Sequence, residues 1–311
     1  MNTPANPSPL DPPTQAVRVV LDTDTYNEID DQFAVAHALL SPDRMRVEAI
    51  HATPFHNDRS DGPADGMQKS YDEILTLLDR MGQPQAQRPA VRKGSAAWLP
   101  DKTTPVESEA AKALLEHVQA AEADGERLYV IAIGALTNVA SSLLMDPSIA
   151  PKMTLLWLGG QPTHWDSAKE FNLRGDLKAS QVVYESKLPL LQFPCACVAE
   201  NLRTTLHELE AHIGGKGPLC DYLVETFRGY HTDHYAWAKE IWDLAPIGWM
   251  VNPDFTRTRV TPRPRLTDSI EWDLSAPAAD AGPFVEARRC WRNPIFKDLF
   301  RKLEAFEAAR S

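Results

Sequence analysis

The sequence predicts an α/β fold: an open, mostly parallel sheet flanked by helices, with a Rossmann-like core, in a single domain. Short, continuous apolar runs recur along the chain, which is typical of strands that are buried on both faces. Segments with apolar residues at helical spacing lie between these runs. This alternation of strand and helix favours a parallel sheet. The chain has 311 residues, 43% of them hydrophobic, which suits one large α/β unit.

The domain is expected to span residues 17–311, because residues 1–16 are Pro-rich and read as a disordered tail. This tail lacks the basic stretch and the apolar core of an export signal, and no apolar run is as long as a membrane span. The four cysteines show no regular spacing and are expected to be reduced. We therefore expect a cytoplasmic protein without a membrane partner.

The first strand is expected at residues 17–21 and leads directly into a cluster of acids. Its residues, VRVVL, are mostly β-branched or apolar, and a helical apolar pattern follows the acids. Between strand and helix lie Asp22, Asp24, Asp30 and Asp31. In open α/β sheets, ligands bind in the crevice outside the carboxyl ends of the strands. The acids therefore occupy the expected position of a functional site.

Carboxylates this close to one another repel unless a positive charge lies between them. Asp oxygens are ligands for hard cations, and Ca2+ in particular accepts carboxylates at irregular angles. The alternative is a solvated loop with a helix N-cap, since Asp is common before helices. However, Asp22 and Asp24 belong to the strand end, where a helix cap has no use for them. The pattern thus indicates a calcium site.

The remaining elements continue the alternation of strand and helix. Further strands are expected at residues 46–55, 129–133, 153–160 and in the second half of 176–194. Helices are expected at residues 66–82, 108–122, after 138, in the first half of 176–194, within 204–240, from 243 and around 295–303. A small-residue and Pro-rich loop is expected at 93–108, and an edge hairpin at 259–275, where prolines disfavour the sheet interior.

Several polar or aromatic residues near these strand ends have two possible roles. Asn57 follows the second strand and either binds a ligand or forms a turn. Thr137, in the turn GALTN, can cap the following helix, and Asp243 is either a site acid or an N-cap. Trp98, the large apolar residue of the 93–108 loop, either contacts a ligand from a lid or packs into a neighbouring groove.

These motifs together resemble those of the nucleoside hydrolase family, the metal-dependent N-ribohydrolases. An apolar strand followed by DxD and then DD is similar to that family's DxDPGxDD, although TYNEI separates Asp24 from Asp30 here, with two extra residues and no Pro-Gly. GALTN resembles the family's GPLTN turn, and EFN at 170–172 follows a strand that ends in GG, as in the family. The order of the three motifs carries the resemblance.

The resemblance implies hydrolysis of the N-glycosidic bond of ribonucleosides by a calcium-bound water, with Asp24 as the catalytic base. The metal ligands it implies are Asp24, Asp31, the main-chain carbonyl of Thr137 and Asp243. The substrate-binding residues it implies are Asp30, Asn57, His164, Glu170, Asn172, Trp242 and Trp98. His164 stands where the family often has another Asn.

The resemblance also bears on the base and on partners. Trp242 occupies a position where some purine-specific members have Trp, so we expect purine ribonucleosides to be preferred and a role in purine salvage. Trp98 is expected to complete a sandwich around the base. A homodimer or homotetramer is expected. Nucleic acid is not, because a net charge of −11 repels phosphates.

Two other functions are consistent with parts of the sequence. DTDT after an apolar strand also resembles the opening motif of haloacid dehalogenase-type phosphatases, in which the metal is Mg2+; Tyr26 and the nearby Asp pair do not fit that motif. The second is a catalytically inactive nucleoside-binding protein in which calcium only stabilises the loops. Assays on nucleosides and phosphate esters, with and without chelator, separate the three.

Overall fold

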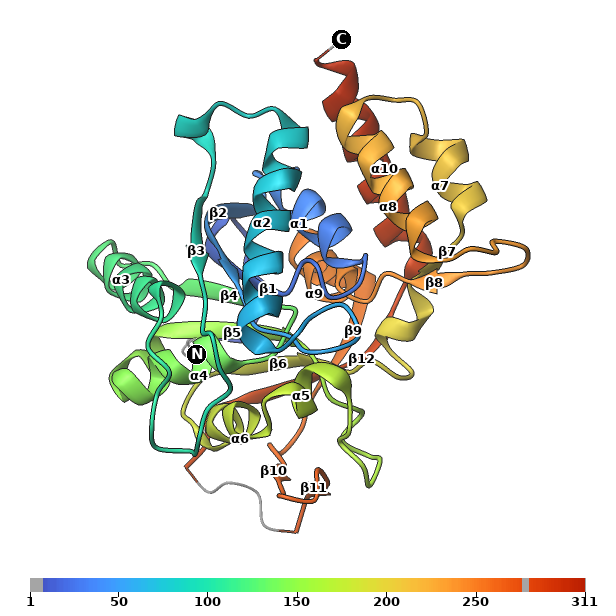
Figure 1. Cartoon of the computed structure of the whole chain (residues 1–311). Coiled ribbons are helices and arrows are strands. Elements are labelled where there is room, and N and C mark those ends of the chain that lie inside the picture. The colour runs from blue at the N-terminus through green and yellow to red at the C-terminus, as the bar shows by residue number, and fades with distance from the viewer. Residues whose placement is uncertain (1–7, 276–279, 311) are drawn as a thin grey trace, which may run out of the picture.

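Eight strands form the central sheet of the computed structural model, which describes residues 8–275 and 280–310 (Figure 1). In spatial order they are β3 (Ala90–Lys93), β2 (Met45–Ala52), β1 (Val17–Thr23), β4 (Leu128–Ala132), β5 (Met153–Leu158), β6 (Leu190–Phe193), β12 (Phe284–Cys290) and β9 (Thr256–Val260). All neighbours are parallel except β12 and β9. The predicted open, mostly parallel sheet is confirmed.

The strands are apolar throughout because both faces of the sheet are covered. Side chains alternate along each strand, so in β1 Val19 and Leu21 enter one hydrophobic core while Val20 enters the other. In β4 Ile131 joins the first core and Val130 the second, in the same alternation. The continuous apolar runs of the sequence therefore reflect two cores.

Helices form a layer on each face of the sheet (Figure 1). The first core is covered by α1 (Asp31–Leu39), α2 (Pro63–Met81), α7 (Leu206–Ile213), α8 (Pro218–Tyr230), α9 (Leu244–Val251) and α10 (Arg292–Ala308). The second is covered by α3 (Glu109–Ala123), α4 (Thr137–Met145), α5 (Phe171–Gly175) and α6 (Leu177–Glu185). Two small antiparallel pairs complete the fold: β7 (Arg203–Thr204) with β8 (Lys239–Glu240), and β10 (Arg265–Leu266) with β11 (Trp272–Asp273).

Two expectations need correction, one about the N-terminal segment and one about the hairpin at 259–275. Residues 8–16 belong to the predicted disordered tail, but part of this segment contacts the domain: Leu10 is buried, and the Pro9 carbonyl accepts a 2.8 Å hydrogen bond from Thr154 Oγ1. Residues 1–7 lie outside the described residues. The predicted edge hairpin is also wrong in part, because β9 joins the main sheet beside β12, a strand that the sequence did not predict. Only β10 and β11 pair as a hairpin.

The sheet order has a switch point between β1 and β4. The chain moves outward from β1 through β2 to β3, and then returns to place β4 and β5 on the other side of β1. Residues that follow β1 and β4 therefore face each other across a crevice at the carboxyl ends of the strands. Gly134 permits this approach, since a Cβ added there would lie 3.0 Å from the Asp24 carboxyl carbon.

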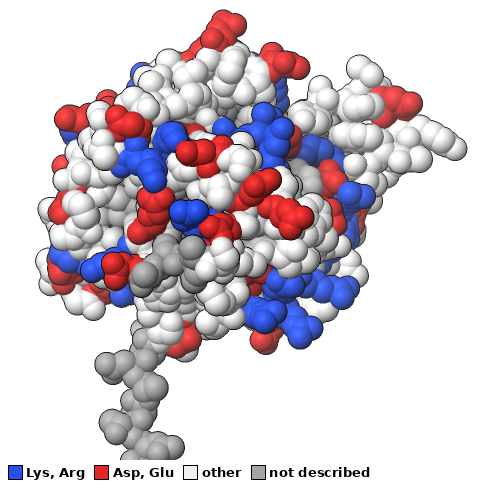
Figure 2. Space-filling model, turned by 90° about the horizontal axis from the view of Figure 1, so that it is seen from below, with Lys and Arg blue, Asp and Glu red and all other residues white. Residues whose placement is uncertain are grey.

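The surface carries charges of both signs, and the cysteines form no disulfides among the described residues. Over most of the face that Figure 2 shows, Lys and Arg lie interspersed with Asp and Glu. All four cysteines are free. Within residues 8–275 and 280–310, no helix is both long and apolar enough to span a bilayer.

Candidate active site

A cavity of about 280 Å³ opens at the switch point of the sheet, and acids line its floor. Its lining consists of Asp24, Asn27, Glu28, Asp30, Asp31, Ile133, Leu158, Gln161, Glu170, Phe171, Asn172, Cys195, Trp242 and Asp243. Asp24 directly follows β1 and is 1% exposed. Among the described residues, neither of its carboxylate oxygens has a hydrogen-bond partner. Such a side chain is costly to bury unless a ligand completes it.

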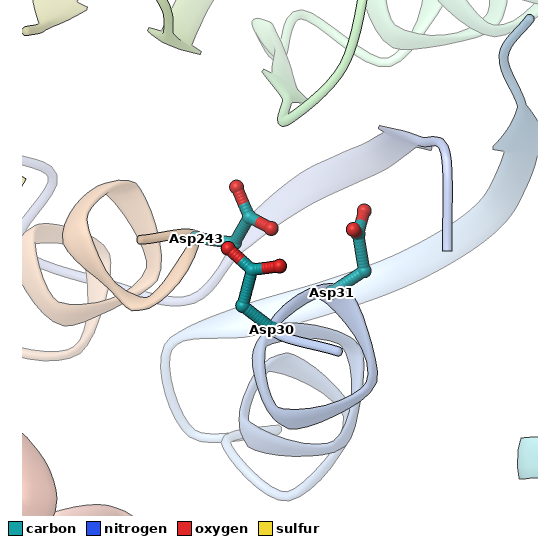
Figure 3. Close-up of side chains that lie close together, drawn as sticks. All are labelled: Asp30, Asp31 and Asp243. Atoms are coloured by element: carbon teal, nitrogen blue, oxygen red, sulfur yellow. The ribbon is translucent and has the colours of Figure 1, made fainter. Parts of the chain in front are cut away.

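Asp30, Asp31 and Asp243 come together in the same cavity from distant parts of the chain (Figure 3). One carboxylate oxygen of each lies within 4.8 Å of those of the other two, and all three residues are buried. Asp30 and Asp31 stand at the start of α1, and Asp243 at the start of α9, where its carboxylate points toward that of Asp30. Neither Asp30 nor Asp243 makes a side-chain cap hydrogen bond. The N-cap explanation for these acids therefore does not hold.

Burial and mutual repulsion disfavour the charged forms of these acids. Burial is the main reason why the pKa values of Asp24, Asp31 and Asp243 lie well above the usual range, and the neighbouring carboxylates raise them further. Burial also raises the pKa of Asp30 to about 6, against the opposing effect of the Lys239 cation. A bound cation would remove the repulsion. Because every side-chain donor is a carboxylate oxygen, the group suits a hard divalent metal ion.

Thr137, the residue expected to give a main-chain donor, does not line the cavity, and its hydroxyl donates a 2.8 Å hydrogen bond to Asp176 Oδ2. Ile133, four residues earlier, does line the cavity, and its carbonyl lies 3.3 Å from Asn172 Nδ2. The chain enters α4 at Thr137, so the strand-end carbonyls at the crevice come from residues before the turn.

Glu170 and Asn172 line the cavity as expected. Glu170 caps α5: one carboxylate oxygen accepts from the Asn172 amide at 2.9 Å, and the other accepts from Leu173 at 3.0 Å and Gly160 at 2.8 Å. Burial raises the Glu170 pKa, and these backbone donors oppose that rise. The side-chain amide of Asn172 donates to the Leu158 carbonyl at 3.1 Å. These contacts hold α5 against the ends of β4 and β5.

Trp242 lines the cavity, but three other predicted contacts do not. Asn57 lies outside it and donates to Asn27 Oδ1 at 2.7 Å, so it holds a lining residue in place. His164 is exposed, because the preceding Thr163 amide is anchored to the buried Glu286 carboxylate at 2.6 Å.

Trp98 lies beside Gly175 at the end of α5, away from the cavity lining. The adjacent Leu99 amide donates to Asp176 Oδ2 at 2.9 Å and fixes this part of the loop. In the described structure, Trp98 and Trp242 therefore do not lie on two sides of the cavity, as a sandwich around a base would require. Packing into a neighbouring groove, the alternative, describes Trp98 better.

Sequence reasoning missed seven of the lining residues. They are Asn27, Glu28, Ile133, Leu158, Gln161, Phe171 and Cys195. The clearest available signal was TYNEI itself: an insertion between two site acids must lie against the site. Glu28 of this insertion is held by Lys239, whose amine donates to its carboxylate at 2.5 Å, and by Arg59, which donates to its carbonyl at 3.1 Å.

The sequence of this chain matches a protein-family model and several curated proteins. The family model described as inosine-uridine preferring nucleoside hydrolase matches residues 19–271. A pyrimidine-specific ribonucleoside hydrolase RihB of Escherichia coli is 25% identical over 156 residues, which cover 48% of this chain and 49% of that protein. A putative protein of the same name from Shigella boydii matches with the same identity over 63% of its length. The matches thus span about half the length of these curated relatives.

Solved structures extend the similarity of fold to most of the chain. A plant nucleoside hydrolase, PpNRh1, superposes with a TM-score of 0.72 at 20% identity, covering 94% of this chain and all of that one (100%). A purine-preferring ribonucleoside hydrolase from Gardnerella vaginalis gives a TM-score of 0.72 at 15% identity, covering 94% and 99%. At these identities the comparison establishes the fold.

Proposed function

The chain belongs to the inosine-uridine preferring nucleoside hydrolase family, and from this membership and the acids of the cavity we propose that it hydrolyses the N-glycosidic bond of ribonucleosides. The observation that carries the proposal is the buried group of carboxylates in which both oxygens of Asp24 lack a partner among the described residues. Such a group suits a bound cation with a water molecule beside it. The products are a free base and ribose.

Calcium is the cation we propose, held by Asp24, Asp31 and Asp243. All the side-chain donors are oxygens, and calcium tolerates the irregular angles of a site assembled from two helix starts and a strand end. When bound, calcium supplies Lewis acidity that lowers the pKa of a water molecule. The carbonyl of Ile133 is a better candidate for the main-chain donor than that of Thr137, because only Ile133 lines the cavity.

The chain's own residues then supply the rest of the chemistry. Asp24 accepts the proton of the attacking water, since its oxygens are otherwise unpartnered. The surrounding carboxylates favour the cationic, oxocarbenium-like sugar of the transition state. Asp30 and Asn172, which line the cavity, hydrogen-bond the ribose hydroxyls in this proposal. Because water attacks directly, inversion at the anomeric carbon is expected.

The stability of the protein should depend jointly on calcium and pH. The Asp30 pKa rises from 3.8 to about 6 on folding. The folded state therefore holds more protons than the unfolded state in this window, and without metal the free energy of unfolding falls as the pH rises through it. Calcium takes the place of those protons. We expect the rise in Tm caused by calcium to be larger at pH 8 than at pH 5. Equal shifts at both values, measured by thermal unfolding, would show that calcium does not bind these acids.

For the base, we propose a preference for purines. The curated relatives are named pyrimidine-specific, whereas one structural neighbour is named purine-preferring and another inosine-guanosine. The local support is Trp242, whose indole lines the cavity and whose amide donates to Asp30 Oδ2 at 3.2 Å. A purine offers this ring a larger face than a pyrimidine does.

Trp242→Ala is expected to lower kcat/KM for inosine, guanosine and adenosine by about threefold to tenfold, the order of an aromatic stacking contact, with less effect on uridine. Steady-state kinetics on these four nucleosides would measure it. The exposed Trp165, changed to Ala, is the matched control. An equal loss on all four substrates, or a wild-type preference for uridine, would reject stacking as the source of base preference.

The alternative functions are separated by the same kind of assay. Among the described residues, no Lys, Arg or His lines the cavity, so a phosphate ester would meet six carboxylates and no cationic side chain there. This observation disfavours a phosphatase. Release of base and ribose from nucleosides, lost with chelator, would support the proposed function, and binding of nucleosides without turnover would support the inactive binding protein. The homo-oligomer, the role in salvage and the cytoplasmic location stay predictions from sequence and resemblance.

A further inference from the structure

Within the part of the chain that the structure describes, the cavity offers no group suited to protonate a departing base. A neutral purine or pyrimidine leaves as an anion unless it gains a proton, so an enzyme normally places a general acid beside it. Among the described residues, the lining contains no His, Lys, Arg or Tyr. Trp242, beside the metal-site acid Asp243, offers only an indole N–H, which is not a usable acid.

The other lining residues that could donate a proton each have another partner or a proposed place around the cation. Asp24 and the three clustered aspartates face one another around the proposed cation. Glu170 accepts three backbone N–H groups as the cap of α5, and the Cys195 thiol is hydrogen-bonded to it. Glu28 is ion-paired with Lys239. The Lys239 amine is directed at Glu28 and at the Glu240 carbonyl, and Lys239 is itself outside the lining.

The same lining is suited to a substrate that already carries the charge. Six carboxylates line the cavity, those of Asp24, Glu28, Asp30, Asp31, Glu170 and Asp243, together with the rings of Trp242 and Phe171. A divalent cation at the floor and the Lys239 ammonium beside Glu28 together neutralise only part of this charge. Carboxylates and aromatic faces both attract organic cations. Asp24, which is buried and unpartnered, marks the cavity as built for a ligand.

We propose that the enzyme's preferred substrates are ribosides of cationic bases, in which the base carries a fixed positive charge, as in N-ribosylpyridinium and N7-alkylated purine ribosides. This inference rests on the proposed function and names a substrate class for it. Water attacks C1′ and gives its proton to Asp24, the C1′–N bond breaks, and its electron pair stays on the ring nitrogen. That pair neutralises the positive ring, so a neutral base departs without a proton from the protein.

Glu28 is the residue that faces the charged base. The metal-site acids are 1–3% exposed and form the floor, whereas the Glu28 side chain is 34% exposed and lies toward the mouth. A ribose bound at the floor must direct its base toward that mouth. Arg59 holds the Glu28 carbonyl and Lys239 holds one carboxylate oxygen, which keeps the side chain at the cavity. Lys239 also lies 5.6 Å from the Trp242 ring, so the pair and the indole form one rim.

The kinetic test compares two ribosides that differ by one methyl group. At pH 6, 7-methylguanosine carries a positive ring and guanosine does not. In the calcium-loaded wild type, kcat/KM is expected to be at least about 10²-fold higher for 7-methylguanosine, because that is the usual contribution of the general acid which only guanosine needs. Equal or faster cleavage of guanosine would overturn the inference, since it would mean that the protein does protonate the base.

A binding test uses ligands without a glycosidic bond, so its result does not depend on turnover. 1-Methylnicotinamide is cationic, and 3-methylbenzamide is its neutral analogue of nearly the same shape. Calorimetric titration into the calcium-loaded protein is expected to show tighter binding of the cation. Glu28→Gln should weaken that binding about fivefold and Lys239→Met should strengthen it by a similar factor, since each changes one unit charge near the ligand. Neither change should alter 3-methylbenzamide binding.

Opposite shifts in the two variants identify charge as the cause, because loss of shape or of folding would weaken binding in both. Glu116→Gln, an exposed acid of α3, removes the same charge far from the cavity and is the matched control. Equal affinity for the two analogues, or shifts of the same sign, would overturn the role of Glu28. If no riboside is cleaved at all, the proposed hydrolysis fails, and the titration still decides whether the cavity selects cations.

Discussion

Asp24→Asn is expected to lower kcat by about 10²- to 10⁴-fold while leaving the fold intact, which is the usual cost of removing a positioned base. The amide keeps the shape of the side chain but cannot accept the proton of the attacking water at neutral pH. Asp24 lines the cavity with both oxygens unpartnered among the described residues, so they are free to accept that proton. The measurement is single-turnover hydrolysis of inosine, with circular dichroism to verify folding.

Asp22→Asn is the matched control for this change. Asp22 lies two residues earlier, on β1, and is equally buried, but it does not line the cavity. Its Oδ1 accepts a 2.8 Å hydrogen bond from Asn138 Nδ2, which an amide oxygen can also accept. Burial raises the Asp22 pKa to about 7, so a neutral side chain costs little there. If Asp24→Asn turned over inosine at the wild-type rate, Asp24 would not be the base.

Asp243→Asn is expected to weaken calcium binding by about 10²-fold or more, because calcium affinity depends on the number of charged ligands. Asp243 offers one oxygen within 4.8 Å of those of Asp30 and Asp31. Calorimetric titration of the metal-free protein with CaCl2 measures the loss directly and does not depend on turnover. Calcium should also raise the Tm of the variant less than that of the wild type.

The control is Asp72→Asn on the exposed surface of α2, which removes an acid that only accepts from Gln68 at 2.9 Å. Its calcium affinity should equal that of the wild type. An unchanged calcium Kd in Asp243→Asn would mean that the ion binds elsewhere. Loss of binding in both variants would indicate a non-specific dependence on net charge.

Asp176 illustrates how contacts outside the cavity decide which residues reach it. Its carboxylate accepts from the Thr137 hydroxyl and from the Leu99 amide through the same oxygen. These bonds tie the start of α4 and the loop that carries Trp98 to the start of α6. Two residues expected at the site, Thr137 and Trp98, are therefore held by contacts outside the cavity, and neither lines it.

The sequence by itself determined several of the elements and the acids that follow β1. Strand and helix periods are properties of neighbouring residues, so β1, β4, β5 and the start of α1 could be predicted from runs of ten residues or fewer. The proximity of Asp24, Asp30 and Asp31 could likewise be predicted from one short stretch of the sequence. Their convergence with Asp243 followed from the resemblance to a known family, since local sequence leaves that acid equally well explained as a cap.

Only the tertiary structure decided which side chains the cavity contains. Asn57 donates to Asn27, and the Thr137 hydroxyl donates to Asp176, so neither residue lines the cavity, whereas Ile133 does. His164 is exposed. These placements depend on contacts between residues far apart in the chain. The strand β12 joined the sheet for the same reason: β6 and β9 supply its hydrogen bonds, and both lie far from it in sequence. Such pairings depend on long-range contacts and leave no local period, so no stretch of the sequence could show them.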